Sequence, residues 1–182
     1  MSQVCIQNST YTQLEIGKLL APLGGMDAFV QEGDRVLLKV NLLSARAPEK
    51  AVTTHPDLVR AVAREVKKAG GKPFIGDSPA GRFTEKALRK AYSATGLEDI
   101  SKEEDVPLNW DTSSVKQEIT EGKTLKRTPV CHFALKADKI ISLPKLKTHS
   151  LQYMTLACKI MYGIIPGLTK ARYHAQFPTR AA

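Results

Sequence analysis

The chain has 182 residues, of which 42% are hydrophobic and 25% charged, with 12 Gly and 10 Pro. This length and composition exclude disordered, fibrous and low-complexity proteins, and we predict a single domain over residues 1–182. No apolar run approaches the roughly 18 residues of a membrane span, and residues 1–13 lack the pattern of a signal peptide, so we expect a cytoplasmic protein without membrane contact.

The net charge of +9 is concentrated in the last third of the chain. Residues 1–122 carry 16 Lys and Arg against 17 Asp and Glu, whereas residues 123–182 carry 11 Lys and Arg against the single acid Asp138. Such a basic segment attracts phosphates, carboxylates, nucleic acid or an acidic protein, and it does not choose among them. A solvated basic face that only aids solubility is the alternative.

Apolar runs and helical periodicity alternate along the first half, and they predict helices at 12–20, 56–69 and 84–95 and strands at 35–40 and 73–76. The helix at 56–69 has the clearest start, because Pro56 occupies its first position and Thr54 or His55 can cap it. The alternation is typical of parallel strands joined by helices.

Residues 97–130 break this alternation with an acidic patch, a short apolar run and a hairpin turn at Glu121–Gly122, and we interpret them as an irregular insertion or sheet edge. A third strand is predicted at 139–143. A helix is predicted at 153–162, closed by Gly163 with Pro166 just beyond. The predicted fold class is α/β: a mostly parallel open sheet with helices on both faces.

Ligands of open parallel sheets bind beyond the carboxyl ends of the strands, so the residues that follow each predicted strand are the candidates. These are Lys39 and Asn41, then Asp77 and Ser78, and finally Lys145, Lys147 and His149. In an extended segment the last three lie on one face, which favours an anion site over a solvated loop. For Asp77 and Ser78, an ordinary turn before Pro79 is the favoured interpretation, ahead of a metal ligand or a base orienter.

Other candidates carry weaker signals. Cys5, Cys131 and Cys158 are too few and too widely spaced for a disulfide framework or a paired metal site, and no metal site is predicted. Cys158 is expected to be a small core residue. Phosphate-binding glycine motifs are absent, while the glycine-flanked segment 163–170 resembles a mobile loop that offers Lys159, Lys170 and His174.

Three stretches together resemble one known family, domain-of-unknown-function family 362: residues 37–43 with 51–56, residues 76–79, and residues 143–149. The resemblance runs from about Val36 to His174 and implies the N-terminal portion of a longer architecture. Members are often joined to a ferredoxin-like domain that binds 4Fe-4S clusters, and no general reaction is established for them. The family usually has Lys-Asn where this chain has Lys159-Ile160, so the resemblance implies that a polar contact beside the site is absent here.

These observations lead to a crevice that binds an anionic small molecule, without deciding whether the protein is an enzyme. A phosphate or carboxylate would be neutralised by Lys39, Lys145, Lys147 and Lys159. The other predicted ligand-binding residues are Asp77 and, through hydrogen bonds, Asn41 and Ser78. Catalysis would be carried by His149 with Lys147. One alternative is an accessory module whose basic surface docks an acidic ferredoxin-type domain, so that a 4Fe-4S cluster would belong only to a fused or partner domain. Sequence-independent nucleic-acid binding is the less favoured second alternative.

Overall fold

The computed structural model describes residues 3–123, 125–149 and 153–176. Its helices are α1 (Ile16–Leu20), α2 (Pro56–Lys68), α3 (Glu85–Ala94), α4 (Leu97–Glu103), α5 (His132–Leu135), α6 (Ala157–Ile160) and α7 (Gly167–Gln176). Its strands are β1 (Arg35–Val40), β2 (Lys72–Gly76), β3 (Ser114–Glu118), β4 (Arg127–Cys131), β5 (Lys139–Leu143), β6 (Lys147–His149) and β7 (Tyr153–Thr155). Short 3₁₀ turns occupy Tyr11–Gln13, Ala21–Leu23, Met26–Ala28, Pro48–Lys50 and Met161–Ile164.

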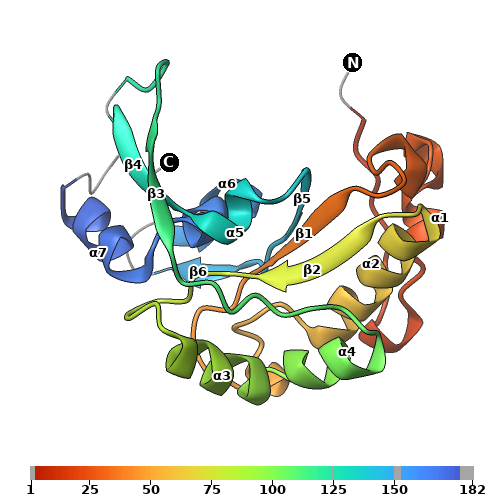
Figure 1. The fold of residues 1–182 in the computed structure, drawn as a ribbon. Coiled ribbons are helices and arrows are strands. Elements are labelled where there is room, and N and C mark those ends of the chain that lie inside the picture. The colour runs from red at the N-terminus through yellow and green to blue at the C-terminus, as the bar shows by residue number, and fades with distance from the viewer. Residues whose placement is uncertain (1–2, 124, 150–152, 177–182) are drawn as a thin grey trace.

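A parallel sheet forms the centre of the molecule, with strand order β2–β1–β5. Helices cover both of its faces, with α3 and α4 below the sheet and α5 above it in Figure 1. The mixed α/β fold predicted from the sequence is therefore confirmed. Parallel strands are buried on both faces, which explains why β1 is apolar apart from the exposed Arg35 at its start and the buried Lys39.

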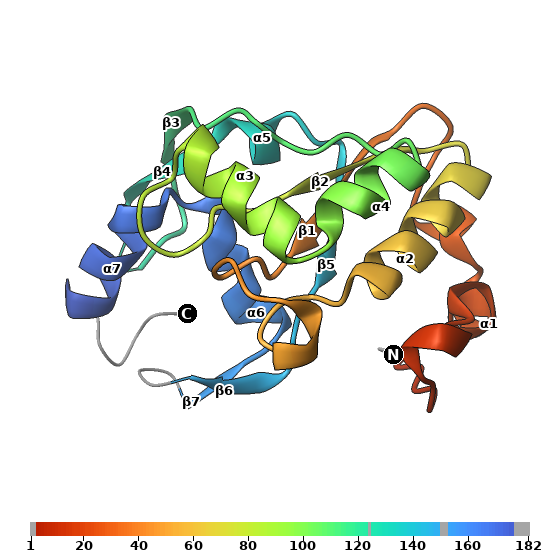
Figure 2. The ribbon, with the colours of Figure 1, turned by 90° about the horizontal axis from the view of Figure 1, so that it is seen from below.

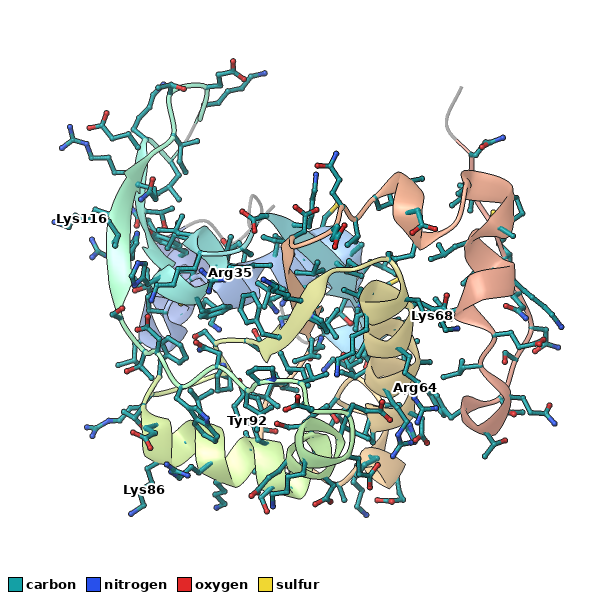
Figure 3. All side chains as sticks on the ribbon, turned by 45° about the vertical axis from the view of Figure 1, so that its right-hand side comes forward. Arg35, Arg64, Lys68, Lys86, Tyr92 and Lys116 are labelled. Atoms are coloured by element: carbon teal, nitrogen blue, oxygen red, sulfur yellow. The ribbon has the colours of Figure 1, made fainter. Side chains whose placement is uncertain are left out.

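Alternate residues of β1 enter two different cores. Val36, Leu38 and Val40 pack in the larger core with α2, α3 and α4, whereas Leu37 packs in a smaller one with Cys131 and Phe133. Figure 3 shows the larger core from another side, with Tyr92 pointing from α3 toward the sheet and Lys86 of the same helix pointing outward. By this alternation the side chain of Lys39 lies on the same face of the sheet as that of Leu37, so a buried ammonium group lies on the side of the smaller core.

The predicted helix at 56–69 and its cap are confirmed. Nδ1 of His55 accepts a hydrogen bond from the Asp57 N–H (3.3 Å), and Pro56 occupies the first helical turn. The strands at 35–40 and 139–143 match their predicted bounds. The strand at 72–76 begins one residue earlier than predicted, and the helix at 85–94 is shorter than predicted by one residue at each end. The expected N-terminal helix is divided into a 3₁₀ turn and the short α1.

The insertion at 97–130 contains more regular structure than its composition suggested. It holds α4, a segment whose Leu108 bridges Ile75 at the outer edge of the sheet, and the antiparallel β3–β4 hairpin. Both features interpreted from the sequence, the sheet edge and the hairpin, are present.

Three expectations for the C-terminal third are wrong. The helix expected at 153–162 is instead strand β7, then α6, then a 3₁₀ turn, because Tyr153–Thr155 pair with β6 and the Thr155 hydroxyl donates to the Lys145 carbonyl oxygen (2.6 Å). The mobile loop expected at 163–170 is the end of that turn and the start of α7. Cys158, expected in the core, is exposed.

Candidate functional site

A cavity of about 810 Å³ opens at the carboxyl ends of the parallel strands. The chain passes from β1 to β2 on one side and returns to β5 on the other side of β1, so the strand order reverses at the β1–β5 junction, where ligands bind in folds of this class. In Figures 1 and 2, α7, which supplies part of the wall, lies at the opposite end of the molecule from α1. The lining residues are Asn41, Leu43, Val52, Asp77, Ser78, Ala80, Gly81, Lys147, Thr148, His149, Thr155, Lys159, Ile160, Tyr162, Gly163, Gly167, Lys170, Ala171, His174 and Ala175.

Three lysines from three different elements line this cavity: Lys147 of β6, Lys159 of α6 and Lys170 of α7. Asp77 is the one acidic side chain among the lining residues that the structure describes, and its Oδ1 atom lies 2.8 Å from Nζ of the buried Lys39. The Lys39 ammonium therefore offsets the Asp77 carboxylate, and no other acid in the described lining compensates the charge of the three lysines. A cavity of this kind concentrates anions.

Lys147 reaches across the junction between β5 and β1. Its Nζ atom donates to Asn41 Oδ1 (3.2 Å) and to the Val52 carbonyl oxygen. Burial lowers the pKa of Lys147 below its ordinary value, and the positive charge of Lys159 lowers this pKa further. The two predicted residues Lys147 and Asn41 are thus brought together, as the strand-tip argument requires.

Lys170 ties α7 to the segment that follows β2. Its Nζ atom donates to the carbonyl oxygens of Ser78 and Pro79, the latter at 3.2 Å. Burial is the main cause that lowers the pKa of Lys170 to about 8, and nearby Asp77 opposes this shift. Burial also lowers the pKa of Lys159. Water is therefore partly excluded around these ammonium groups, which strengthens their attraction for an anion.

Three aromatic side chains form a row beside the lysines. The His174 ring lies between those of His149 and Tyr162, with ring centroids 5.8 Å and 5.3 Å away respectively. Burial lowers the pKa of both histidines below the ordinary value, and the positive charge of Lys159 lowers both further. Both imidazoles are consequently neutral at neutral pH, the state in which a histidine accepts a proton.

The buried Lys39–Asp77 pair lies beneath the cavity and holds several of the segments that line it. Asp77 Oδ2 accepts the Leu42 N–H (2.7 Å), and Lys39 Nζ also donates to the Val40 carbonyl oxygen (2.7 Å). The Gly163 backbone lies directly against this pair, so that a Cβ atom there would overlap Asp77 Oδ1 and Lys39 Nζ. Asp77 is therefore more than a turn residue, because it fixes the end of β1 relative to the end of β2.

Thr54 joins β1 to β5 at the same junction. Its buried hydroxyl accepts the Asn41 N–H (2.8 Å) and donates to the Leu143 carbonyl oxygen (2.6 Å). We expect Thr54→Val to lower the free energy of unfolding by about 2–4 kcal/mol, because it leaves two buried backbone groups without partners. Urea unfolding measures the change. The neighbouring Thr53 is the matched control: it is also buried, its hydroxyl has no hydrogen-bond partner among the described residues, and Thr53→Val should be neutral or stabilising.

Of the remaining residues predicted from the sequence, some line the cavity and others lie outside it. Ser78, Lys159 and His149 line the cavity, while Lys39 lies beneath it with a fully buried side chain. Lys145 lies outside the lining, and its Nζ atom donates to the Tyr11 hydroxyl (2.9 Å). It does share one face with Lys147 and His149, since these three are partly buried while Leu146 and Thr148 are exposed.

A second hollow, of about 710 Å³, lies at the opposite ends of the strands, near Arg35 and Lys72. Its lining mixes three lysines and Arg35 with Asp105, Asp111 and Asp138, so the charges there largely compensate one another. Because it lies at the amino ends of the parallel strands, it is the less favoured location for a site.

Comparison with known proteins places the chain in a family. The model of the family described as "Domain of unknown function (DUF362)" matches residues 36–181. The chain belongs to the DUF362 family. It is 40% identical over 158 residues to the thylakoid-associated protein sll1697 of Synechocystis sp. (strain ATCC 27184 / PCC 6803 / Kazusa), an alignment that covers 87% of this chain and 47% of the relative. The chain thus spans about half the length of that relative, and no solved structure matches it.

The sequence places part of the site in this DUF362 chain in the wrong elements. It offers Lys170 and His174 as side chains of a mobile loop and assigns Tyr162 to a helix, although all three line the cavity and none is among the residues predicted to bind the anion. Lys170 and His174 are four residues apart, the spacing that places two side chains on one face of a helix. That spacing is the signal that could have identified both residues. It is missed because Pro166 is interpreted as following the end of one helix and not as preceding the start of the next.

The DUF362 chain carries no feature that tests its expected cofactor or location. No helix among the described residues is long and apolar enough to cross a membrane, and within the same residues no group of three or more His, Cys, Asp or Glu side chains could hold a metal ion. The cytoplasmic location stays a prediction, as does the assignment of any 4Fe-4S cluster to a fused or partner domain.

Proposed function

We propose that the cavity at the carboxyl ends of β1, β2 and β5 binds a phosphate or carboxylate group. The observation that carries the proposal is the gathering of Lys147, Lys159 and Lys170 in a lining whose one described acid, Asp77, is already paired with Lys39. Charge-assisted hydrogen bonds from such ammonium groups are the strong contacts for an anion.

The hydrogen bonds of the unliganded lysines support this proposal. Lys147 and Lys170 donate to neutral oxygens, namely carbonyls and an amide, rather than to carboxylates. An incoming anion can therefore replace a neutral acceptor of either lysine without separating an ion pair. His149 beside them is neutral at neutral pH, and it would act as a proton acceptor if a bound anion reacts.

The test is a calorimetric titration of the 182-residue chain with inorganic phosphate at low ionic strength. We expect Lys147→Ala to weaken binding at least about tenfold, or 1.4 kcal/mol. Lys145→Ala is the matched control, because Lys145 lies two residues away on the same face but outside the lining, and its affinity should change by less than about twofold. Equal affinity of the wild type and Lys147→Ala, or no binding of phosphate and of acetate, would exclude the proposal.

A further inference from the structure

The cavity is much larger than its proposed anion site requires. Its volume of about 810 Å³ falls in the range of pockets that hold whole organic molecules, about 300–1,000 Å³. Beyond the lysines, the lining combines polar side chains such as Asn41, Ser78 and Thr155 with the apolar side chains of Leu43, Val52 and Ile160. An anion on its own would leave these apolar side chains facing water, so the occupant of the cavity has a second, apolar part.

The aromatic row indicates what this second part is. His149, His174 and Tyr162 come from β6, α7 and the 3₁₀ turn before α7, and their rings are tilted by 37° and 31° between neighbours. Centroid separations of 5.3–5.8 Å are those of aromatic pairs that interact through ring faces and edges. All three residues line the cavity, so a planar ring placed there adds a further member to the row.

The chemical class of the charged group of this ligand can also be inferred. Three ammonium groups reach the cavity from three separate elements. A phosphate monoester offers three terminal oxygens and up to two negative charges, whereas a carboxylate offers two oxygens and one charge. The phosphate monoester therefore matches the number and the charge of the lysines better.

We infer that the ligand is a phosphate monoester attached to a planar aromatic ring, with its phosphate at Lys147, Lys159 and Lys170 and its ring against Tyr162 and His174. This inference rests on the proposed anion site and adds the class of molecule that the site accepts.

The experiment compares four probes by calorimetry: inorganic phosphate, phenyl phosphate, cyclohexyl phosphate and benzoate. Phenyl and cyclohexyl phosphate carry the same charge and similar volume, so their affinity ratio isolates the planar ring. We expect phenyl phosphate to bind about fivefold to tenfold more tightly than cyclohexyl phosphate, and benzoate to bind at least about tenfold more weakly than phenyl phosphate.

Tyr162→Leu should bring the phenyl-to-cyclohexyl ratio close to one while leaving the affinity for inorganic phosphate within about threefold. Tyr153→Leu is the control, because the Tyr153 side chain is 92% exposed and lies outside the lining, and the ratio should stay at its wild-type value. Thermal melts verify that each variant folds, and His174→Leu replaces Tyr162→Leu if the latter does not.

The outcomes separate the two proposals. If inorganic phosphate binds but phenyl and cyclohexyl phosphate have equal affinity for the wild type, the aromatic inference is overturned and the anion site stands. Benzoate binding as tightly as phenyl phosphate overturns the phosphate assignment. If none of the four probes binds, the proposed anion site itself is wrong.

Discussion

Anion binding to this chain should weaken as the pH rises through about 8, well below the range in which an ordinary lysine loses its proton. Lys170 lies in the cavity wall, and burial lowers its pKa to about 8. Above that pH the unliganded cavity loses one of its three ammonium groups. A bound anion stabilises the protonated form, so the midpoint in the complex lies somewhat higher than in the free protein.

Sulfate is the suitable probe, since its charge stays constant across this pH range. We expect the wild-type affinity to fall about tenfold or more between about pH 7 and 9.5, because the lost contact is a hydrogen bond from a charged donor. Lys170→Arg is the matched control, because a guanidinium stays protonated throughout this range. An affinity that falls equally in the wild type and in Lys170→Arg would show that another group titrates.

On the acid side of the same profile, the affinity changes in the same direction and also falls as the pH rises. Burial, Lys159 and the neighbouring cations lower the pKa of His149 and of His174 below 6.5. Both rings therefore gain a positive charge only as the pH falls below about 6.5, and sulfate affinity should increase there. The profile thus decreases from acid to alkaline pH in two separate steps, the second of which depends on Lys170.

Much of the fold follows from local patterns in the sequence. The runs at 35–40 and 139–143 are short, apolar and bounded by turn residues, and the helix that starts at Pro56 has its cap and its proline in place. Each of these elements is specified by its own residues. The sites at their carboxyl ends follow from the general rule for parallel sheets, which needs only the strands to be correct.

The errors occur in the C-terminal third, where contacts between neighbouring segments, rather than the residues of one segment, decide the structure. Strand β7 has only three residues, and it exists because β6 pairs with it and Thr155 bonds to the Lys145 and Lys147 carbonyls. Pro166 was interpreted as following a helix, yet it precedes one, since a proline is tolerated equally well before the first turn. Both errors affected the segment that supplies Lys170 and His174.

Lys39 shows the same limit in a different way. Its position at a strand tip suggested a ligand contact, but strand alternation turns it to the face of Leu37, where Gly163 and Asp77 cover it. How tightly this face is covered depends on Gly163, which lies more than 100 positions later in the chain. The sequence therefore indicates the place of Lys39 along its strand, and only the tertiary structure determines that it supports the site from below.

The largest loss of stability is expected when one member of the Lys39–Asp77 pair is removed. The two side chains are 0% and 5% exposed, with 2.8 Å between Lys39 Nζ and Asp77 Oδ1. Asp77→Asn leaves the ammonium group buried without a counter-charge, and Lys39→Met does the same to the carboxylate. Each should lower the free energy of unfolding by about 3–5 kcal/mol. Because a whole domain is stabilised by only about 5–15 kcal/mol, either variant should be close to unfolding at physiological temperature.

The double variant Lys39→Met/Asp77→Asn separates the cost of an unpaired charge from the cost of altered packing. It contains no buried charge at this position, so we expect it to be more stable than the sum of the two single losses by at least about 2 kcal/mol in urea unfolding. The exposed pair Arg89–Glu85 is the control, with side chains 66% and 56% exposed, and Glu85→Gln should cost less than about 1 kcal/mol. Losses that add without coupling would mean that Lys39 and Asp77 contribute through packing alone.

Because Gly163 contacts both members of the pair and Ser78 donates its N–H to the Gly163 carbonyl (2.9 Å), any coupled loss should also open the cavity wall and weaken phosphate binding.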